Sequence, residues 1–228
     1  MLTHDGKLHV IGFGKDTDAN NEYYSMFVAA VDESLAFQTR MSKDGSYTQF
    51  AAVRAIGSHW YIGGDFYPKF VPKNDLPIYY ANSKIKPGGG YLWSVRPLHK
   101  VVTASDNIAT AIDDRATTYS LSQSRGTTSL IAVDASGRIA PAVTYKSAFC
   151  KVDTFTPSGH GLLAIRQSCA GSNGKRGLVW INPVTGVETV VDVLGSTPRF
   201  IMSSGRNWYG VGVNGRKQEF VFGTLEGQ

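Results

Sequence analysis

The segment LVWINPVTG, Leu178–Gly186, followed by VETVVDVL at residues 187–194, decides the fold. An apolar run ends in a polar turn that holds Asn, Pro and Gly, and a second apolar run returns. Two such runs joined by a turn of these residue types predict a β-hairpin. The pattern recurs at residues 27–41, 78–98 and 130–145, and its first half recurs at residues 220–227.

A second set of turns precedes these hairpins. Each is marked by Gly, Ser or Asp, they lie 45 to 56 residues apart, and they are Asp5-Gly6, Gly57-Ser58, Asp113-Asp114, Ser158-Gly159 and Ser204-Gly205. Units of four short strands at a period of about 40 to 50 residues are typical of β-propellers. The chain therefore resembles β-propeller repeat proteins. We predict an all-β fold of about five four-stranded blades in one domain, residues 1–228, whose last blade is incomplete or completed by another strand.

Composition limits the class of function. The 228 residues are 42% hydrophobic and 18% charged, which indicates a globular chain. A net charge of +5 suits phosphate, an acidic glycan or an acidic protein. However, no cluster of five Lys or Arg and no nucleic-acid-binding motif is present, so we expect no nucleic acid partner. No run of about 18 apolar residues predicts a membrane span, and the N-terminus lacks the pattern of a signal peptide.

One glycine motif could indicate a cofactor. Gly210–Gly215 matches G-x-G-x-x-G, but the residues that follow read as a strand, whereas a dinucleotide site needs a helix there. We interpret Asn214-Gly215 as a hairpin turn. The five histidines lack the spacing of metal ligands. We therefore expect neither a cofactor nor a metal.

The two cysteines, Cys150 and Cys169, fall near the start and the end of one predicted hairpin. We expect two buried free thiols. A disulfide is the alternative, and it would need an oxidising compartment.

The segment Ser42–Thr48, SKDGSYT, resembles the Asp-box turn of sialidases and related propellers. Its Gly lies one place early, and Gln49 stands where that family has Trp. The resemblance implies a sialidase-like site, which would need arginines to bind the substrate carboxylate. An ordinary Asp-Gly turn is the alternative interpretation.

Glycoside hydrolysis needs two carboxylates on either side of the scissile bond. In the predicted propeller, Asp106, Asp113 and Asp153 flank the innermost strands and could approach the central channel. Acidic residues are also common in turns, because their side chains bond nearby backbone N–H groups. A glycoside hydrolase or sialidase-like enzyme that uses these residues is therefore the alternative function.

We favour a non-catalytic propeller that recognises a glycan or a protein surface. Its predicted ligand-binding residues are aromatic or basic and lie near loops: Trp60, Tyr67, Trp93, Trp208 and Arg206. The unpaired strand position in the last unit predicts an oligomer or a larger assembly. By analogy with small propellers in phage tails and fibres, that assembly could be a virion. The sequence contains no signal that fixes its location.

Overall fold

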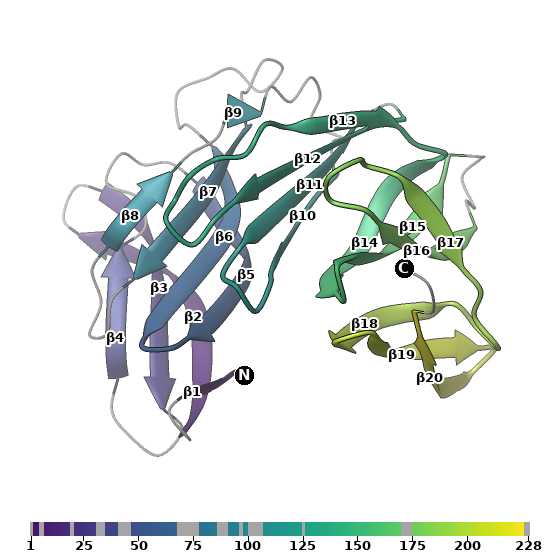
Figure 1. Ribbon diagram of the computed structural model, residues 1–228. Coiled ribbons are helices and arrows are strands. Elements are labelled where there is room, and N and C mark those ends of the chain that lie inside the picture. The colour runs from purple at the N-terminus through teal and green to yellow at the C-terminus, as the bar shows by residue number, and fades with distance from the viewer. Residues whose placement is uncertain are drawn as a thin grey trace. The chain divides into compact units, whose positions relative to one another are not determined.

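The computed structural model describes the backbone of residues 2–4, 7–18, 21–30, 35–40, 47–67, 78–85, 91–95, 98–99, 107–124, 126–169 and 175–225. It describes the side chains of residues 52–63, 109–123, 126–169 and 175–225. Over these residues the chain forms strands and turns and no helix (Figure 1). No helix that could cross a bilayer therefore occurs in this described part.

The first two sheets belong to one compact unit of the chain. The first sheet has the order β1-β2-β3-β4 and consists of Leu2–His4, Lys7–Asp18, Asn21–Ala30 and Leu35–Arg40. The second has the order β5-β6-β7-β8 and consists of Tyr47–Ile56, His59–Tyr67, Ile78–Ile85 and Tyr91–Val95. A short strand, β9 (Leu98–His99), also pairs with β7.

The last three sheets form the main part of a second compact unit. The third sheet consists of β10 to β13: Asn107–Ile112, Thr118–Ser124, Thr127–Val133 and Val143–Lys146. The fourth consists of β14 to β17: Phe149–Ser158, Gly161–Ser168, Arg176–Ile181 and Glu188–Val191. The fifth has three strands, β18 to β20: Pro198–Ser204, Asn207–Asn214 and Lys217–Thr224.

The structure confirms the predicted all-β class and the repeated antiparallel four-stranded sheets. Four of the five predicted turns separate the first two strands of a sheet, at Gly57-Ser58, Asp113-Asp114, Ser158-Gly159 and Ser204-Gly205. The fifth, Asp5-Gly6, lies outside the described residues, as does most of the Asp-box segment 42–48. That the chain is a single domain remains a prediction.

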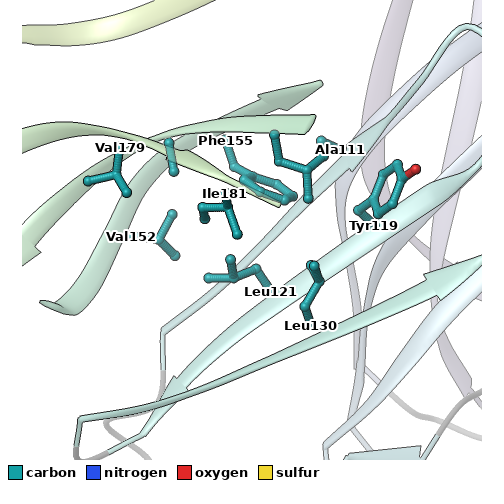
Figure 2. Packing of buried hydrophobic residues seen from close by; sticks show 10 residues of the cluster. Ala111, Tyr119, Leu121, Leu130, Val152, Phe155, Val179 and Ile181 are labelled. Carbon is teal, nitrogen blue, oxygen red and sulfur yellow. The ribbon is translucent and has the colours of Figure 1, made fainter. Parts of the chain in front are cut away.

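Two hydrophobic cores cover the two faces of the fourth sheet. Because side chains alternate along a strand, Leu162 and Ala164 of β15 enter one core, while Leu163 and Ile165 enter the other. This explains why β15 and β16 read as continuous apolar runs instead of alternating ones. The first core joins the third and fourth sheets (Figure 2) and contains Ala111, Tyr119, Leu121, Leu130, Val152, Phe155, Leu162, Ala164, Val179 and Ile181. The second core joins the fourth and fifth sheets.

Two hairpin loops between third and fourth strands share one turn chemistry. Asn182 accepts hydrogen bonds on its side-chain oxygen from the backbone N–H groups of Val184 and Thr185, at 2.9 and 3.1 Å. Asp134 does the same for Ser136 and Arg138, at 2.9 and 3.0 Å. These hydrogen bonds satisfy backbone N–H groups in each loop, where the chain reverses direction and strand pairing stops. The hydrogen bond from the Ser136 hydroxyl, followed by the backbone bond from Arg138, lowers the pKa of Asp134 to about 2.

The cysteines form a disulfide, so the expectation of free thiols was wrong. Cys150 lies at the start of β14 and Cys169 directly after β15, with 4.8 Å between their Cα atoms. The antiparallel register places Phe149 opposite Ser168. It therefore brings the two thiols together at the open end of the hairpin. Both cysteines are exposed.

Candidate binding pocket

A pocket of about 440 Å³ lies in the second unit. One wall is the end of β13 and the start of β14, residues 145–149. The other wall is the turn before β17 and β17 itself, residues 185–188 and Val190. The fourth sheet's hairpin and the connection from the third sheet thus bring together residues about 40 positions apart.

A fully buried arginine lies behind the pocket. Arg166, on β15, has a side-chain exposure of 0% and forms an ion pair with Glu188. Its guanidinium also donates to the side-chain oxygen of Gln123, to the Thr128 hydroxyl at 3.1 Å and to the Ser147 hydroxyl at 3.4 Å. A buried charge is tolerated only when it is paired and hydrogen-bonded in this way.

Glu188 connects this arginine to the pocket wall. Its Oε1 accepts from the guanidinium of Arg166 and from the Tyr145 hydroxyl at 3.0 Å, and its Oε2 accepts from the Ser147 hydroxyl at 2.7 Å. Burial, followed by the charge of Glu188, raises the pKa of Tyr145 above its usual value. A phenol is protonated at neutral pH at its ordinary pKa of about 10, and the raised pKa extends to higher pH the range in which Tyr145 donates to the carboxylate.

Gly186 allows the tyrosine to sit where it does. Its φ is +74°, which is a left-handed conformation that favours glycine. A Cβ on Gly186 would lie 2.4 Å from Cδ1 of Tyr145, so the aromatic ring packs directly on the backbone of the turn. Both reasons require glycine in the NPVTG turn.

Phe149 completes the aromatic part of the wall. The guanidinium carbon of Arg166 lies 5.5 Å from the centroid of its ring, within the range of a cation–π contact. The next residue, Cys150, is held by the disulfide, and the Cys169 N–H donates to the carbonyl of Ala148 at 3.1 Å. This wall is therefore fixed to the end of β15 by the disulfide and this hydrogen bond, in addition to the pairing of Phe149 with Ser168.

The pocket offers contacts of two kinds. Aromatic rings and the valines at 187 and 190 supply apolar surface, while Lys146, the hydroxyls and Glu188 supply polar groups. Glu188 is the single carboxylate among the residues that line it. Nowhere among the described residues do three His, Cys, Asp or Glu side chains gather as a metal site would require. The arrangement suits binding of an amphipathic group.

The sequence-predicted ligand residues lie elsewhere. Trp60 and Trp208 are 3% and 2% exposed, and the Trp208 ring packs over Gly223 in the second core. Arg206 is exposed in the turn between β18 and β19. Tyr67 and Trp93 lie on β6 and β8, and their side chains lie outside the described residues. Ligand contact by these five residues remains a prediction, and the burial of the two tryptophans favours a packing role for them.

The predicted carboxylates have separate partners. Asp113 accepts a hydrogen bond from the Tyr119 hydroxyl at 3.3 Å. Asp153 pairs with Arg176 at 2.7 Å and with Lys151 at 3.7 Å. Neither aspartate lines the pocket. Asp106 lies outside the described residues, so the predicted catalytic set is not tested.

Sequence reasoning missed the residues that organise this pocket. Arg166 interrupts the apolar run GLLAIRQS, and Glu188 lies two residues after the NPVTG turn. A charge inside a strand buried on both faces is the signal that could have indicated a buried ion pair. Its partner could not have been named, because the two residues meet only through the pairing of β15, β16 and β17.

Comparisons with known proteins do not place the chain in a family. No family model matches the chain, and no curated protein matches it. One similar solved structure is a luciferin-regenerating enzyme, with a TM-score of 0.48, 11% identity, and coverage of 94% of this chain and 77% of that one. Another is a GH43 endo-arabinanase from Bacillus licheniformis, with a TM-score of 0.39, 10% identity, and coverage of 93% and 92%. Likeness at this level supports no conclusion about activity.

Proposed function

We propose that the chain is a β-propeller module of about five blades that binds a glycan or a protein surface and has no catalytic role. The observation that supports this function best is the pocket between β13–β14 and β17. Its polar groups are held in place by the buried pair of Arg166 and Glu188. A preformed site of this kind loses little entropy when a ligand binds.

A sugar unit suits the pocket better than a purely apolar group. A volume of about 440 Å³ lies within the range of small-ligand sites, which is about 300 to 1,000 Å³. The rings of Tyr145 and Phe149 can pack against the C–H face of a pyranose. A carboxylate has about four acceptor positions, and three on Glu188 are occupied by protein donors. One acceptor position on Oε2 is left for a ligand hydroxyl.

Glycan-array screening followed by calorimetric titration tests this proposal. The variant Val187→Arg fills the pocket from a side chain that is 58% exposed. We expect it to weaken binding by at least about tenfold, since it removes apolar contact and occupies the volume. The matched control is Val184→Arg, because Val184 is 80% exposed in the same turn but does not line the pocket. Equal affinity in both variants, or no glycan binding by the wild type, would refute the assignment of this pocket as a glycan site.

The alternative proposal is a glycoside hydrolase or sialidase-like enzyme. It would use Asp106, Asp113 and Asp153, and its two carboxylates would have to lie about 5 to 9.5 Å apart. Substitution of Asp113 and Asp153 by Asn should then abolish turnover of a glycan that the wild type hydrolyses. Unchanged turnover in both variants would exclude these residues as the catalytic pair.

We also propose that the module is a subunit of a larger assembly, with a virion tail or fibre as the candidate setting. The support is the fifth sheet, which has three strands over the described residues where the other sheets have four or five. Immunogold labelling of assembled particles with an antibody to this chain tests the setting. Labelling confined to unassembled protein would refute it.

A further inference from the structure

The outer edge of the fifth sheet differs from the same edge of the other four. In the first four sheets the third strand pairs with a fourth, which is β4, β8, β13 or β17. In the fifth sheet the third strand, β20, pairs with β19 alone over the residues that the structure describes. Its eight residues pair without a register shift. A long, regular edge of this kind is prone to pair with another strand.

The side chains of β20 also differ from those of the corresponding strands. β12 and β16 are largely buried, with patterns eBBBBiB and eiBBBB, whereas β20 has the pattern eeieBeie. Two large aromatic residues of β20 are among the most exposed hydrophobic side chains, with Phe220 at 88% and Phe222 at 78%. They alternate with Val221, which enters the second core, so their rings lie on the opposite face of the fifth sheet, beside its open edge. Exposed aromatic side chains at such a place indicate an interaction surface.

One hydrogen bond shows which backbone groups of β20 face the open edge. The N–H of Leu225 donates to the carbonyl of Arg206 at 3.0 Å, which continues the ladder beyond the end of β20. Because hydrogen-bonded positions alternate in an antiparallel pair, the odd-numbered residues of β20 bond to β19. The even-numbered residues therefore direct their N–H and C=O groups outward, and these are Gln218, Phe220, Phe222 and Thr224.

We propose that the strand that pairs with this edge is β20 of a second copy of the chain, in an antiparallel arrangement centred on Val221. The sequence Phe220-Val221-Phe222 is palindromic, so a two-fold axis through Val221 places each Phe220 opposite the Phe222 of the other copy. Both residues direct their backbone groups outward, so these positions form hydrogen-bonded pairs. Gln218 lies opposite Thr224 in the same register.

The charges on the strand agree with this register. Lys217 falls opposite Leu225, and Glu219 falls opposite Gly223, so no like charges face each other across the interface. The chain has a net charge of +5, which disfavours random self-association. The strand pair is centred on Phe220–Phe222, which carry no charge, so charged side chains are not brought together at the middle of the interface.

The exposed area predicts a reversible dimer. With roughly 200 Å² for each phenylalanine, Phe220 and Phe222 together expose about 330 Å² in one copy. Because side chains stand on the face of a sheet, edge pairing covers only the flanks of these rings. It therefore removes less than the total of about 650 Å² of two copies from water, together with the strand backbone, which is small for a specific interface. We therefore expect weak association, with a dissociation constant on the order of 100 µM.

Sedimentation equilibrium tests the proposal on the whole chain. The wild-type mass should rise from 24.7 kDa toward twice that value over about 1 to 200 µM. The double variant Phe220→Lys/Phe222→Lys places lysines opposite each other and should remain monomeric. The variant Phe220→Lys/Phe222→Asp places opposite charges across this register and should restore a dimer that weakens with salt.

Each result of the sedimentation experiment supports or overturns the proposed dimer. If the wild type remains monomeric at 200 µM, the proposal is overturned, and the strand that pairs with the open edge does not come from a second copy of the chain. A dimer that the lysine pair does not disrupt would place the contact elsewhere, and a lysine–aspartate variant that does not recover would refute the register. Both positions are highly exposed, so folding should be unaffected, and circular dichroism checks this. The inference identifies the partner in the proposed assembly and is independent of glycan binding, so either can fail alone.

Discussion

The pair of Arg166 and Glu188 allows a quantitative prediction. The substitution Glu188→Gln preserves the shape of the side chain but removes the negative charge. It also leaves one acceptor oxygen in place of two, so either Tyr145 or Ser147 loses its acceptor. Arg166 is then a buried cation with an exposure of 0% and neutral partners only. Removing one partner of a buried pair costs about 3 to 5 kcal/mol.

We expect a loss near the lower end, about 3 kcal/mol, because the Glu188 side chain is 13% exposed and Arg166 keeps its bonds to neutral oxygens. Urea unfolding, followed by circular dichroism and tryptophan fluorescence, measures this loss. With a slope of about 3 kcal/mol/M, the midpoint should fall by about 1 M. The double variant Arg166→Met/Glu188→Gln should lose less than the sum of the two single variants, since the uncompensated charge is gone.

Glu219→Gln is the matched control. The Glu219 carboxylate accepts from the hydroxyl of Ser196 and the amide of Asn214, both at 3.0 Å, so its recorded partners are neutral. Its substitution should cost about 1 kcal/mol or less. If Glu188→Gln costs no more than this control, Arg166 does not depend on the ion pair, and the reasoning about the buried charge is refuted.

Three further predictions concern the disulfide, one glycine and one turn. Replacing Cys150 and Cys169 together by Ser should lower stability by about 3 kcal/mol, as expected for a loop of 15 to 20 residues, and a reducing agent should lower the wild type equally in urea melts; an unchanged midpoint would contradict this. Gly186→Ala should cost more than about 2 kcal/mol, whereas Gly215→Ala, with φ +60° and no atom within 4 Å, should cost about 1; equal losses would show that ring contact is unimportant. An NMR titration that follows the carboxyl carbon signal of Asp134 should give a pKa of about 2, below the usual 3.8. The charged carboxylate therefore stabilises the turn above about pH 4, and this contribution is lost as the pH falls toward 2. A titration with the usual pKa would contradict the hydrogen-bonded geometry.

The sequence predicted the strand repeat well because its signals are local. The NPVTG turn and the apolar runs on either side of it lie within one hairpin, so spacing and turn chemistry were sufficient to place β16 and β17. Likewise, the number of residues between the turns Gly57-Ser58 and Asp113-Asp114 corresponds to one complete sheet. Whether the sheets form a propeller depends on packing between sheets that are distant in sequence, and turn spacing does not encode that directly.

The pocket was not predicted because its residues are neighbours only in the folded sheet. Glu188 and Arg166 are 22 positions apart, and Ser147 lies 19 positions before Arg166. Aromatic density drew attention instead to Trp60 and Trp208, both of which are buried. An aromatic side chain gives the same sequence signal in a core as in a binding site, and only burial distinguishes the two.

The way in which Glu188 is held suits a binding role for this carboxylate better than a catalytic one. A general acid must place its proton on the substrate, and a nucleophile must present a free oxygen to it. Glu188 instead accepts from Arg166, Tyr145 and Ser147, which leaves one acceptor position on Oε2, and the ion pair with Arg166 disfavours protonation of the carboxylate. The same bonds keep the wall of the pocket rigid, which favours recognition of one ligand shape. A carboxylate fixed in this way can orient a hydroxyl group, and this is the role that we assign to it.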